Sequence, residues 1–435
     1  MTIDSKLIEE GEAFIRKKAF LHCTSNDDTD DDLRSFRSCL RWMCLDQSNC
    51  FRAIISWTLF ILLTIVVPTL SHFILACSNC DWKHQRPYDI AVQLSLSIIA
   101  TLSFICLTHF ISKYGLQRFL FLDKLCNDSE KVQQRYTAQL NRSFKLLFIF
   151  ILPGFVAESA YKIWWYSSGG TRIPFLGNVY MSNAMACFLE LCSWLYRTST
   201  YLLICMLFRL ICHLQILQLQ DFALVFQEES DVAMVLAEHL RIRRQLKIIS
   251  HRFRAFIVLA LIFVSASQLA SLLITLKSHA DVYIFMAGEL TLCSVGLVTG
   301  IFICLRSAAK ITHKAQAITS HATKWHVCAT IDSYDTPDYD TPMQIASCPR
   351  IFALDVYSDE EEAVDEDDMD DTKFIPPHAH TISFQKRQAL VTYLENNRAG
   401  ITIFGFMLDR TWLHTICAIE LSLVLWLLQK TVGFS

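Results

Sequence analysis

Long apolar stretches alternate with polar connections along the chain, and this pattern predicts the fold class. Six stretches each exceed the roughly 20 mostly apolar residues that an α-helix needs to cross a bilayer. A seventh stretch, 412–428, is shorter and contains Glu420, but its second half is mostly aliphatic. The six longer stretches are 53–76, 88–112, 144–166, 179–213, 255–276 and 282–305. The sequence therefore predicts an all-α, polytopic membrane protein with seven transmembrane helices.

The helical spacing of apolar residues continues well beyond several of these stretches. It extends past 179–213, breaks near Glu228, and then resumes in a run that leads into 255–276. Each arm would contain about 48 residues and measure about 70 Å, whereas the hydrocarbon layer is about 30 Å thick. The sixth stretch also continues toward Trp325, and residues 384–397 form a further amphipathic segment. We therefore expect long cytosolic helix extensions that form an anchor bundle.

Basic residues gather in alternate connections, which predicts the orientation of the helices. The connections after the second and fourth stretches are rich in Lys and Arg, whereas those after the first, third and fifth contain few. Because cytosolic loops retain Lys and Arg, the N-terminus is expected in the cytosol and the C-terminus outside. The sequons at Asn127 and Asn141 then lie in a cytosolic connection, so glycosylation of either would contradict this orientation.

These patterns divide the chain into four segments. Residues 1–50 form a cytosolic N-terminal segment without an apolar signal-peptide core, and 51–329 contain transmembrane helices 1–6 with their cytosolic extensions. Residues 330–382 form an acidic cytosolic insert, which is expected to be disordered because like charges repel and few apolar residues are nearby. Residues 383–435 contain the cytosolic amphipathic helix and transmembrane helix 7.

Composition agrees with a membrane protein, since hydrophobic residues make up 53% of the chain and charged residues only 19%. Most of the 17 cysteines lie in apolar stretches or in connections assigned to the cytosol, where they act as small hydrophobic residues. Cys77 and Cys80 are the exception, because they follow the first stretch on its outer side, where a disulfide is chemically feasible.

The sequence does not predict an enzyme. It contains no P-loop and no H-E-x-x-H or G-x-S-x-G motif. Three histidines and a cysteine between His313 and Cys328 carry metal-ligating groups, but offsets of eight and five residues between His313, His321 and His326 spread them around a helix. We interpret them as exposed residues, and we expect no metal site, no cofactor and no nucleic-acid partner.

Ionisable residues inside the apolar stretches predict a polar site. A charge in hydrocarbon costs several kcal/mol unless it is paired or faces water. Five such groups lie toward the outer side in the predicted orientation, and aromatic and amide side chains accompany them. The candidate pocket residues are His72, Glu158, Tyr161, Trp165, Glu190, Trp194, Gln268, Glu289 and Glu420. Apolar walls with a few polar groups are typical of a site for a small-molecule ligand.

A structural interpretation of the same residues stays open. Glu158 and Lys162 are spaced as an i,i+4 ion pair, and Glu190 lies two helical turns from Arg197. The aromatic run 164–166 fits an interfacial belt.

The last apolar stretch carries a stripe of residues at helical spacing. The stripe is polar at its cytosolic end and small or aliphatic beyond, and it consists of Thr411, His414, Thr415, Ala418, Leu421, Ser422 and Leu425. Several copies around a symmetry axis would enclose a water-filled path, in which Leu421 and Leu425 form an apolar constriction that gates by dewetting. The alternative is ordinary helix packing through small residues.

Two segments carry a resemblance to a known family. Residues 238–254, EHLRIRRQLKIISHRFR, and 408–428, LDRTWLHTICAIELSLVLWLL, are similar to a plant family of seven-helix membrane proteins. That family resembles insect gustatory and odorant receptors in predicted topology, in its long cytosolic helices and in a split seventh helix. The resemblance covers nearly the whole chain apart from the N-terminal tail and the acidic insert.

The resemblance implies a homotetrameric, ligand-gated cation channel, surrounded by membrane lipids and located in the plasma membrane. It implies that the seventh helix lines the pore and that an unidentified small molecule is the ligand. In the insect proteins the last helix contains Thr-Tyr, five mostly apolar residues and Gln-Phe, whereas the nearest frame here has Thr411-Trp412 and Ala418-Ile419 at these places.

Two other functional classes compete with a channel. The first is a non-conducting scaffold or signalling protein, in which the anchor bundle and the acidic insert recruit cytosolic protein partners. A secondary transporter is disfavoured, because the chain has no inverted repeat and no matching pair of helices broken by Gly or Pro.

Overall fold

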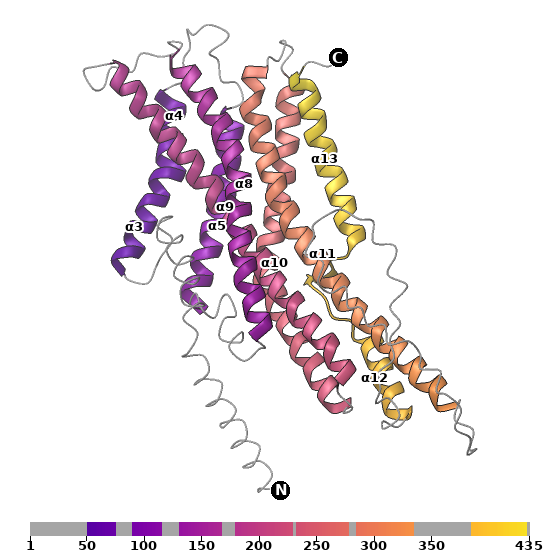
Figure 1. Cartoon of the computed structure of the whole chain (residues 1–435). Coiled ribbons are helices and arrows are strands. Elements are labelled where there is room, and N and C mark those ends of the chain that lie inside the picture. The colour runs from indigo at the N-terminus through magenta and orange to yellow at the C-terminus, as the bar shows by residue number, and fades with distance from the viewer. Residues whose placement is uncertain are drawn as a thin grey trace. The chain divides into compact units, whose positions relative to one another are not determined.

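The structure of the chain is a computed structural model, and its described part is almost entirely α-helical (Figure 1). The residues that it describes are 50–74, 89–114, 130–167, 179–228, 232–277, 284–334 and 384–432. Cys77, Cys80, Asn127 and the acidic run 358–371 lie outside them, so the predictions for these residues stay predictions. The helix that precedes the insert runs to Tyr334, beyond the boundary predicted at 329.

In the described part of the chain, seven helical segments are long and apolar enough to cross a membrane, as the sequence predicts. The elements in chain order are α3 (Cys50–Ile61), the π-helical turn η1 (Leu62–Val66), α4 (Val67–Ile74), α5 (Asp89–Tyr114), α8 (Glu130–Ser167), α9 (Val179–Glu228), α10 (Val232–Lys277), α11 (Ile284–Tyr334), α12 (Phe384–Asn396), β1 (Thr402–Ile403), β2 (Phe406–Met407) and α13 (Arg410–Val432). The first span consists of α3, η1 and α4 together. The chain is therefore an all-α, multi-pass membrane protein.

Among the described helices, three are more than twice as long as the roughly 20 residues that a bilayer requires, and this confirms the predicted helix extensions. Helix α9 contains 50 residues, α10 contains 46 and α11 contains 51. The chain divides into two compact units, and each of these three helices contributes to both. The first unit includes residues 1–211, 253–307 and 411–435, and the second includes 212–252 and 308–410.

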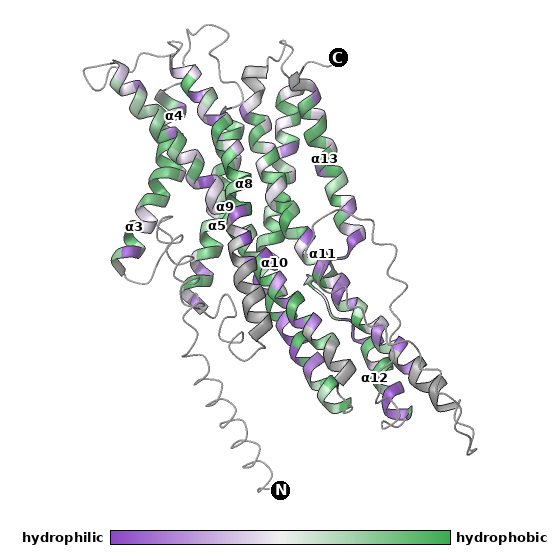
Figure 2. Cartoon of the chain, in the orientation of Figure 1, coloured by the Kyte–Doolittle hydropathy of each residue, from purple (hydrophilic) through white to green (hydrophobic). Residues whose placement is uncertain are grey.

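Helix α9 forms the centre of the first unit. Every residue from Tyr201 to Phe208 is buried, and the ring of Tyr201 packs so closely on α11 that a Cβ atom added at Gly300 would lie 2.3 Å from it. Outward-facing side chains of α4, α8 and α10, such as Phe73, Phe148 and Leu273, are apolar and exposed. Figure 2 shows the same hydrophobic colouring along these helices. Exposed apolar side chains are expected where helices face lipid.

The first span contains a wide turn that has an identifiable cause. Pro68 has no backbone N–H, so the carbonyl of Thr64 loses its partner in a regular α-helix. The chain adopts the π-helical turn η1 at this point, in which the Val67 N–H donates to the Leu62 carbonyl. Hydroxyl groups of other helices satisfy freed carbonyls: Ser97 donates to Thr64 O at 2.9 Å and Ser193 donates to Leu63 O at 2.5 Å. The turn therefore also joins α5 and α9 to the first span.

In the second unit, α12 packs through Leu390, Val391 and Leu394, all of which are buried. The side chain of His239 lies between two aromatic rings, 6.3 Å from Phe222 and 5.8 Å from Tyr393 between ring centroids. Burial and the nearby Arg243 lower the pKa of His239 to about 4. His239 precedes the predicted membrane stretch 255–276.

A short antiparallel hairpin, which the sequence pattern does not predict, follows α12. Thr402 pairs with Met407 and Ile403 with Phe406, which leaves Phe404 and Gly405 as a two-residue loop. Both loop residues have positive φ, 47° and 92°, as a type I′ turn requires. The hairpin separates α12 from α13, so the structure has the split seventh helix on which the sequence resemblance to insect receptors rests.

Candidate functional site

A buried ammonium group lies at the centre of the candidate site. Lys162 on α8 is only 1% exposed, and its Nζ atom lies within ion-pair distance of three carboxylates. The distances are 2.9 Å to Glu190 Oε2 on α9, 3.2 Å to Glu289 Oε1 on α11, and 3.6 Å to Glu158 Oε1 one turn earlier on α8. The hydroxyl group of Ser71 on α4 donates to the other carboxylate oxygen of Glu190. We call these five residues the lysine network.

A second buried cation, Arg197 on α9, organises the polar side chains of α5. Its Nη2 donates to Gln93 Oε1 at 2.7 Å, and its Nη1 lies 3.3 Å from both Gln93 O and Ser97 Oγ. The amide nitrogen of Gln93 donates in turn to Asp89 Oδ1 at 3.2 Å, and the Nδ1 atom of His72 lies 3.6 Å from Asp89 Oδ2. These five residues form the arginine network.

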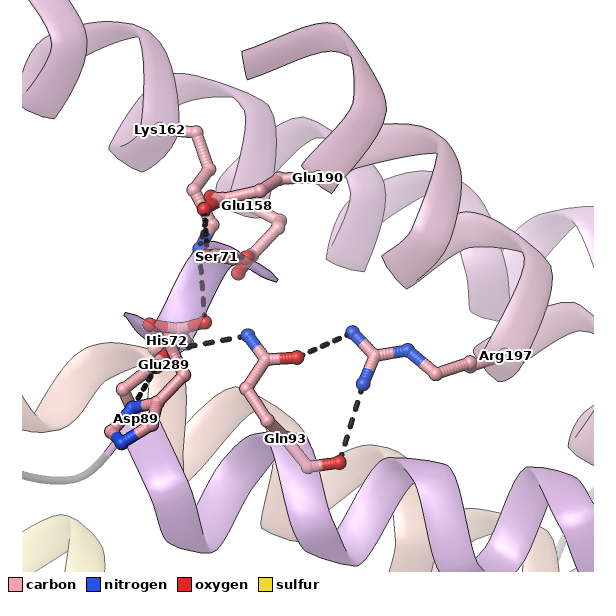
Figure 3. A network of polar contacts seen from close by, with 9 residues as sticks. All are labelled: Ser71, His72, Asp89, Gln93, Glu158, Lys162, Glu190, Arg197 and Glu289. Atoms are coloured by element: carbon pink, nitrogen blue, oxygen red, sulfur yellow. Dashed lines mark hydrogen bonds and ion pairs between the residues drawn. The ribbon is translucent and has the colours of Figure 1, made fainter. Parts of the chain in front are cut away.

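The two networks meet on α4. Ser71 belongs to the lysine network and His72, the next residue, belongs to the arginine network (Figure 3). His72 is the more accessible end, since its side chain is 41% exposed whereas that of Asp89 is 6% exposed. The networks together join α4, α5, α8, α9 and α11 through charged and hydrogen-bonded groups inside the membrane-spanning part of the chain.

The two networks bring four acidic side chains and two cations together in the buried part of the helix bundle. Three carboxylates surround the single ammonium of Lys162, and Asp89 adds a fourth acid near Arg197. Buried charges persist where they are paired and hydrogen-bonded. A small cavity between the networks is lined by Glu158, Lys162, Glu190, Trp194, Arg197 and residues of α4 and α5, and its volume is about 10 Å³. That volume is enough for about one water molecule.

The structure brings together four of the nine predicted pocket residues and places one close by. Glu158, Glu190 and Glu289 surround Lys162, Trp194 lines the cavity, and His72 is connected to the cavity wall through Asp89 and Gln93. Trp194 also packs closely on α8, because a Cβ atom at Gly154 would lie 3.1 Å from its ring.

The other four predicted pocket residues make separate contacts. Trp165 is buried with Tyr166 and Cys187 in an apolar cluster, and Tyr161 lies 6.3 Å from Trp164 between ring centroids. Gln268 donates to the Ser294 carbonyl at 3.4 Å. Glu420 on α13 accepts a hydrogen bond from Ser265 on α10. None of these four lines the small cavity described above.

The two cations at the centres of the networks are not among the predicted pocket residues. The sequence predicts Lys162 only as the i,i+4 partner of Glu158, and Arg197 only as a partner of Glu190. In the structure Arg197 instead bonds to Gln93 and Ser97. A signal was present, because a Lys or Arg well inside an apolar stretch has the same desolvation cost as the acids that were selected.

The seven predicted pore residues of α13 are placed on one side of that helix. Thr411, His414, Thr415, Ala418, Leu421, Ser422 and Leu425 are all exposed. The packed side of α13 carries Glu420, Val424 and Leu427, which are 2–5% exposed. Among the described residues, no group of three or more His, Cys, Asp or Glu side chains has a geometry that could hold a metal ion.

The chain is similar to a known protein in fold and to a known family in sequence. No curated protein matches the sequence. The solved structure of the insect olfactory receptor OR5 from Machilis hrabei is similar in fold, with a TM-score of 0.55 and 13% sequence identity over 93% of this chain and 100% of that chain. A family described as "Protein of unknown function (DUF3537)" matches residues 31–419. Because the match spans most of the sequence, the chain belongs to the DUF3537 family.

Proposed function

We propose that this protein is a chemoreceptor-like, ligand-gated cation channel. Four copies assemble in the plasma membrane, with the α13 helices around a central pore and a ligand pocket in the outer half of each helix bundle. The observation that carries this proposal is the exposed stripe on α13, supported by the likeness in fold to an insect olfactory receptor.

The stripe has the geometry that a pore-lining surface needs. Successive residues of an α-helix are about 100° apart, which places Thr411, Ser422 and Leu425 roughly opposite Glu420. Glu420 faces the bundle of its own chain, so the stripe faces away from it. The hydroxyl groups of Thr415 and Ser422 donate to carbonyls of their own helix, but the His414 imidazole in contact with lipid tails would lose hydrogen bonds to water. Water in a shared pore satisfies the imidazole, and the aliphatic pair Leu421 and Leu425 supplies a constriction that gates by dewetting.

The lysine and arginine networks are the proposed position of the ligand pocket. They lie among five helices, and the cavity between them has room for about one water molecule. A larger ligand therefore binds only when these helices separate, which breaks some of the ion pairs of Lys162. Binding and helix movement are linked in this way, as gating requires.

Current recordings test the proposal directly. The double variant Leu421→Ser/Leu425→Ser wets the proposed constriction, so the protein in a planar bilayer should pass more ligand-independent current than the unchanged chain. The matched control is Leu273→Ser on α10, whose side chain is exposed on the outer surface of the same unit and should leave the current unchanged. Equal, zero current from all three chains would contradict the channel, and ion substitution measures its preference for cations.

The scaffold remains the second candidate, and a surface of the second unit favours it. Gln385, Gln388, Thr392 and Asn396 line an open hollow of about 520 Å³ along α12. Uncharged polar side chains of this kind suit a protein partner. Deletion of 358–371 separates the two functions: a scaffold should lose its bound cytosolic partners, whereas a channel should keep its assembly and its current.

A further inference from the structure

A four-residue segment of α10 contacts three other helices through polar side chains. The segment is Ser265–Gln268, and its members point in different directions because successive residues turn by about 100°. Ser265 Oγ donates to Glu420 on α13, Ser267 Oγ donates to Ser95 Oγ on α5 at 2.8 Å, and Gln268 Nε2 donates to the Ser294 carbonyl on α11 at 3.4 Å. All of these residues belong to the first unit.

Two of these contacts lead back to the charged networks. On α5, Ser95 lies between Gln93 and Ser97, which both bond to Arg197. On α11, Ser294 follows Glu289, which pairs with Lys162, by little more than one helical turn. The segment 265–268 therefore contacts α5, which carries part of the arginine network, and α11, which carries Glu289 of the lysine network.

The third contact leads to α13. Glu420 is 3% exposed, and the Ser265 hydroxyl donates to one of its carboxyl oxygens. Its second oxygen has no hydrogen-bond partner among the described residues. Burying a carboxyl group among apolar helices is costly unless its hydrogen bonds are satisfied, so the hydrogen bond from Ser265 favours the present position of α13.

We propose that Ser265 is a positioning residue that couples the lysine and arginine networks to α13. A change in either network shifts α5 or α11, the shift moves the segment 265–268, and Ser265 transmits it to Glu420. This role of Ser265 rests on the proposed function, in which α13 lines the pore. Contact between these helices amounts to energetic coupling only if the effects on α13 of a change in a network and a change at Ser265 are not additive. We expect these effects not to be additive.

Hydrogen–deuterium exchange of the α13 amides in the full chain, reconstituted in lipid nanodiscs, tests the coupling. Lys162→Met disturbs the lysine network, and it should speed exchange in α13 by about threefold, the factor that an average interhelical hydrogen bond in a membrane contributes. Ser265→Ala should speed it by a similar factor. In the combined variant, Lys162→Met should add nothing further, because the connection is already broken.

Ser271→Ala provides a matched control six residues further along the same helix. Ser271 is 1% exposed, but its hydroxyl donates to the carbonyl of Ser267 in its own helix, at 2.8 Å. In that background, Lys162→Met should keep its full effect on α13. If Lys162→Met yields no folded protein, Ser95→Ala replaces it, since it removes the contact of α5 with Ser267.

The coupling is overturned if the network variant speeds exchange in α13 equally with and without Ser265→Ala, or if it leaves α13 exchange unchanged in the otherwise unaltered chain. Exchange needs no ligand and no current, so failure of the channel hypothesis leaves this test intact. A chain that conducts but shows additive effects would contradict the coupling alone.

Discussion

Removal of the ammonium group of Lys162 is the sharpest test of the site. In the Lys162→Met variant, the carboxylates of Glu158, Glu190 and Glu289 lose the cation that lies 2.9–3.6 Å from them. At the effective dielectric constant of about 20 that suits buried protein sites, each such contact corresponds to roughly 5 kcal/mol of Coulomb attraction. Desolvation of the charges offsets most of this attraction. Breaking a buried pair by removing one partner typically costs 3–5 kcal/mol, and we expect a loss of about that size.

A compensated variant separates charge imbalance from lost packing. Glu190→Gln and Glu289→Gln, added to Lys162→Met, remove two of the three uncompensated carboxylates and should restore most of the lost stability. Lys145→Met, at an exposed position of the same helix, should change the free energy of unfolding by no more than about 0.5 kcal/mol.

The assay is equilibrium unfolding of the purified chain in mixed micelles, followed by tryptophan fluorescence. A Lys162→Met chain within about 1 kcal/mol of the unchanged protein would refute the reasoning, since the ammonium would then not stabilise the network. So would a compensated variant that is as unstable as Lys162→Met alone.

Two further predictions concern other parts of the fold. Gly300→Ala places a Cβ atom 2.3–2.6 Å from the ring of Tyr201, so it should destabilise the chain by about 1–3 kcal/mol in the same unfolding assay, and Tyr201→Leu in the same chain should recover part of the loss. For His239, whose pKa in the folded chain is about 4 against 6.5 in the unfolded chain, the neutral form is favoured by folding. Its contribution to stability is therefore complete above pH 6.5 and falls as the pH drops toward 4, so His239→Phe should flatten the pH dependence of the unfolding midpoint in that window, and an unchanged slope would contradict it.

Helix positions were the most predictable part of this structure. The break near Glu228 was expected from the apolar periodicity alone, and α9 ends at Glu228 while α10 begins at Val232. The segment 384–397 became α12, which spans Phe384–Asn396. Such elements follow from the 3.6-residue period of side chains that one helix buries, a property that one segment of sequence contains.

Contacts between helices were less predictable, because sequence spacing says nothing about which residue of another helix lies opposite. The three glutamates at 158, 190 and 289 were identified from their desolvation cost, but their common partner Lys162 was not recognised as such. The expected partner of Arg197 was Glu190, two helical turns away on its own helix, whereas in the structure Arg197 donates to Gln93 of α5. Glu420 and Gln268 share the chemistry of the site residues, yet they belong to the contacts of α10.

The wide turn η1 gives the first span a property that a regular helix lacks. A π-turn contains one residue more than an α-turn needs, so relaxing it to α-helical geometry rotates everything beyond it by about 100° about the helix axis. Such a rotation would swing Ser71 away from Glu190 and His72 away from Asp89, while α3 kept its place. Pro68 opposes that relaxation because it has no backbone N–H to donate in a regular α-helix. The proline ring therefore helps to fix the rotation of α4 about its axis at which Ser71 contacts the lysine network and His72 contacts the arginine network.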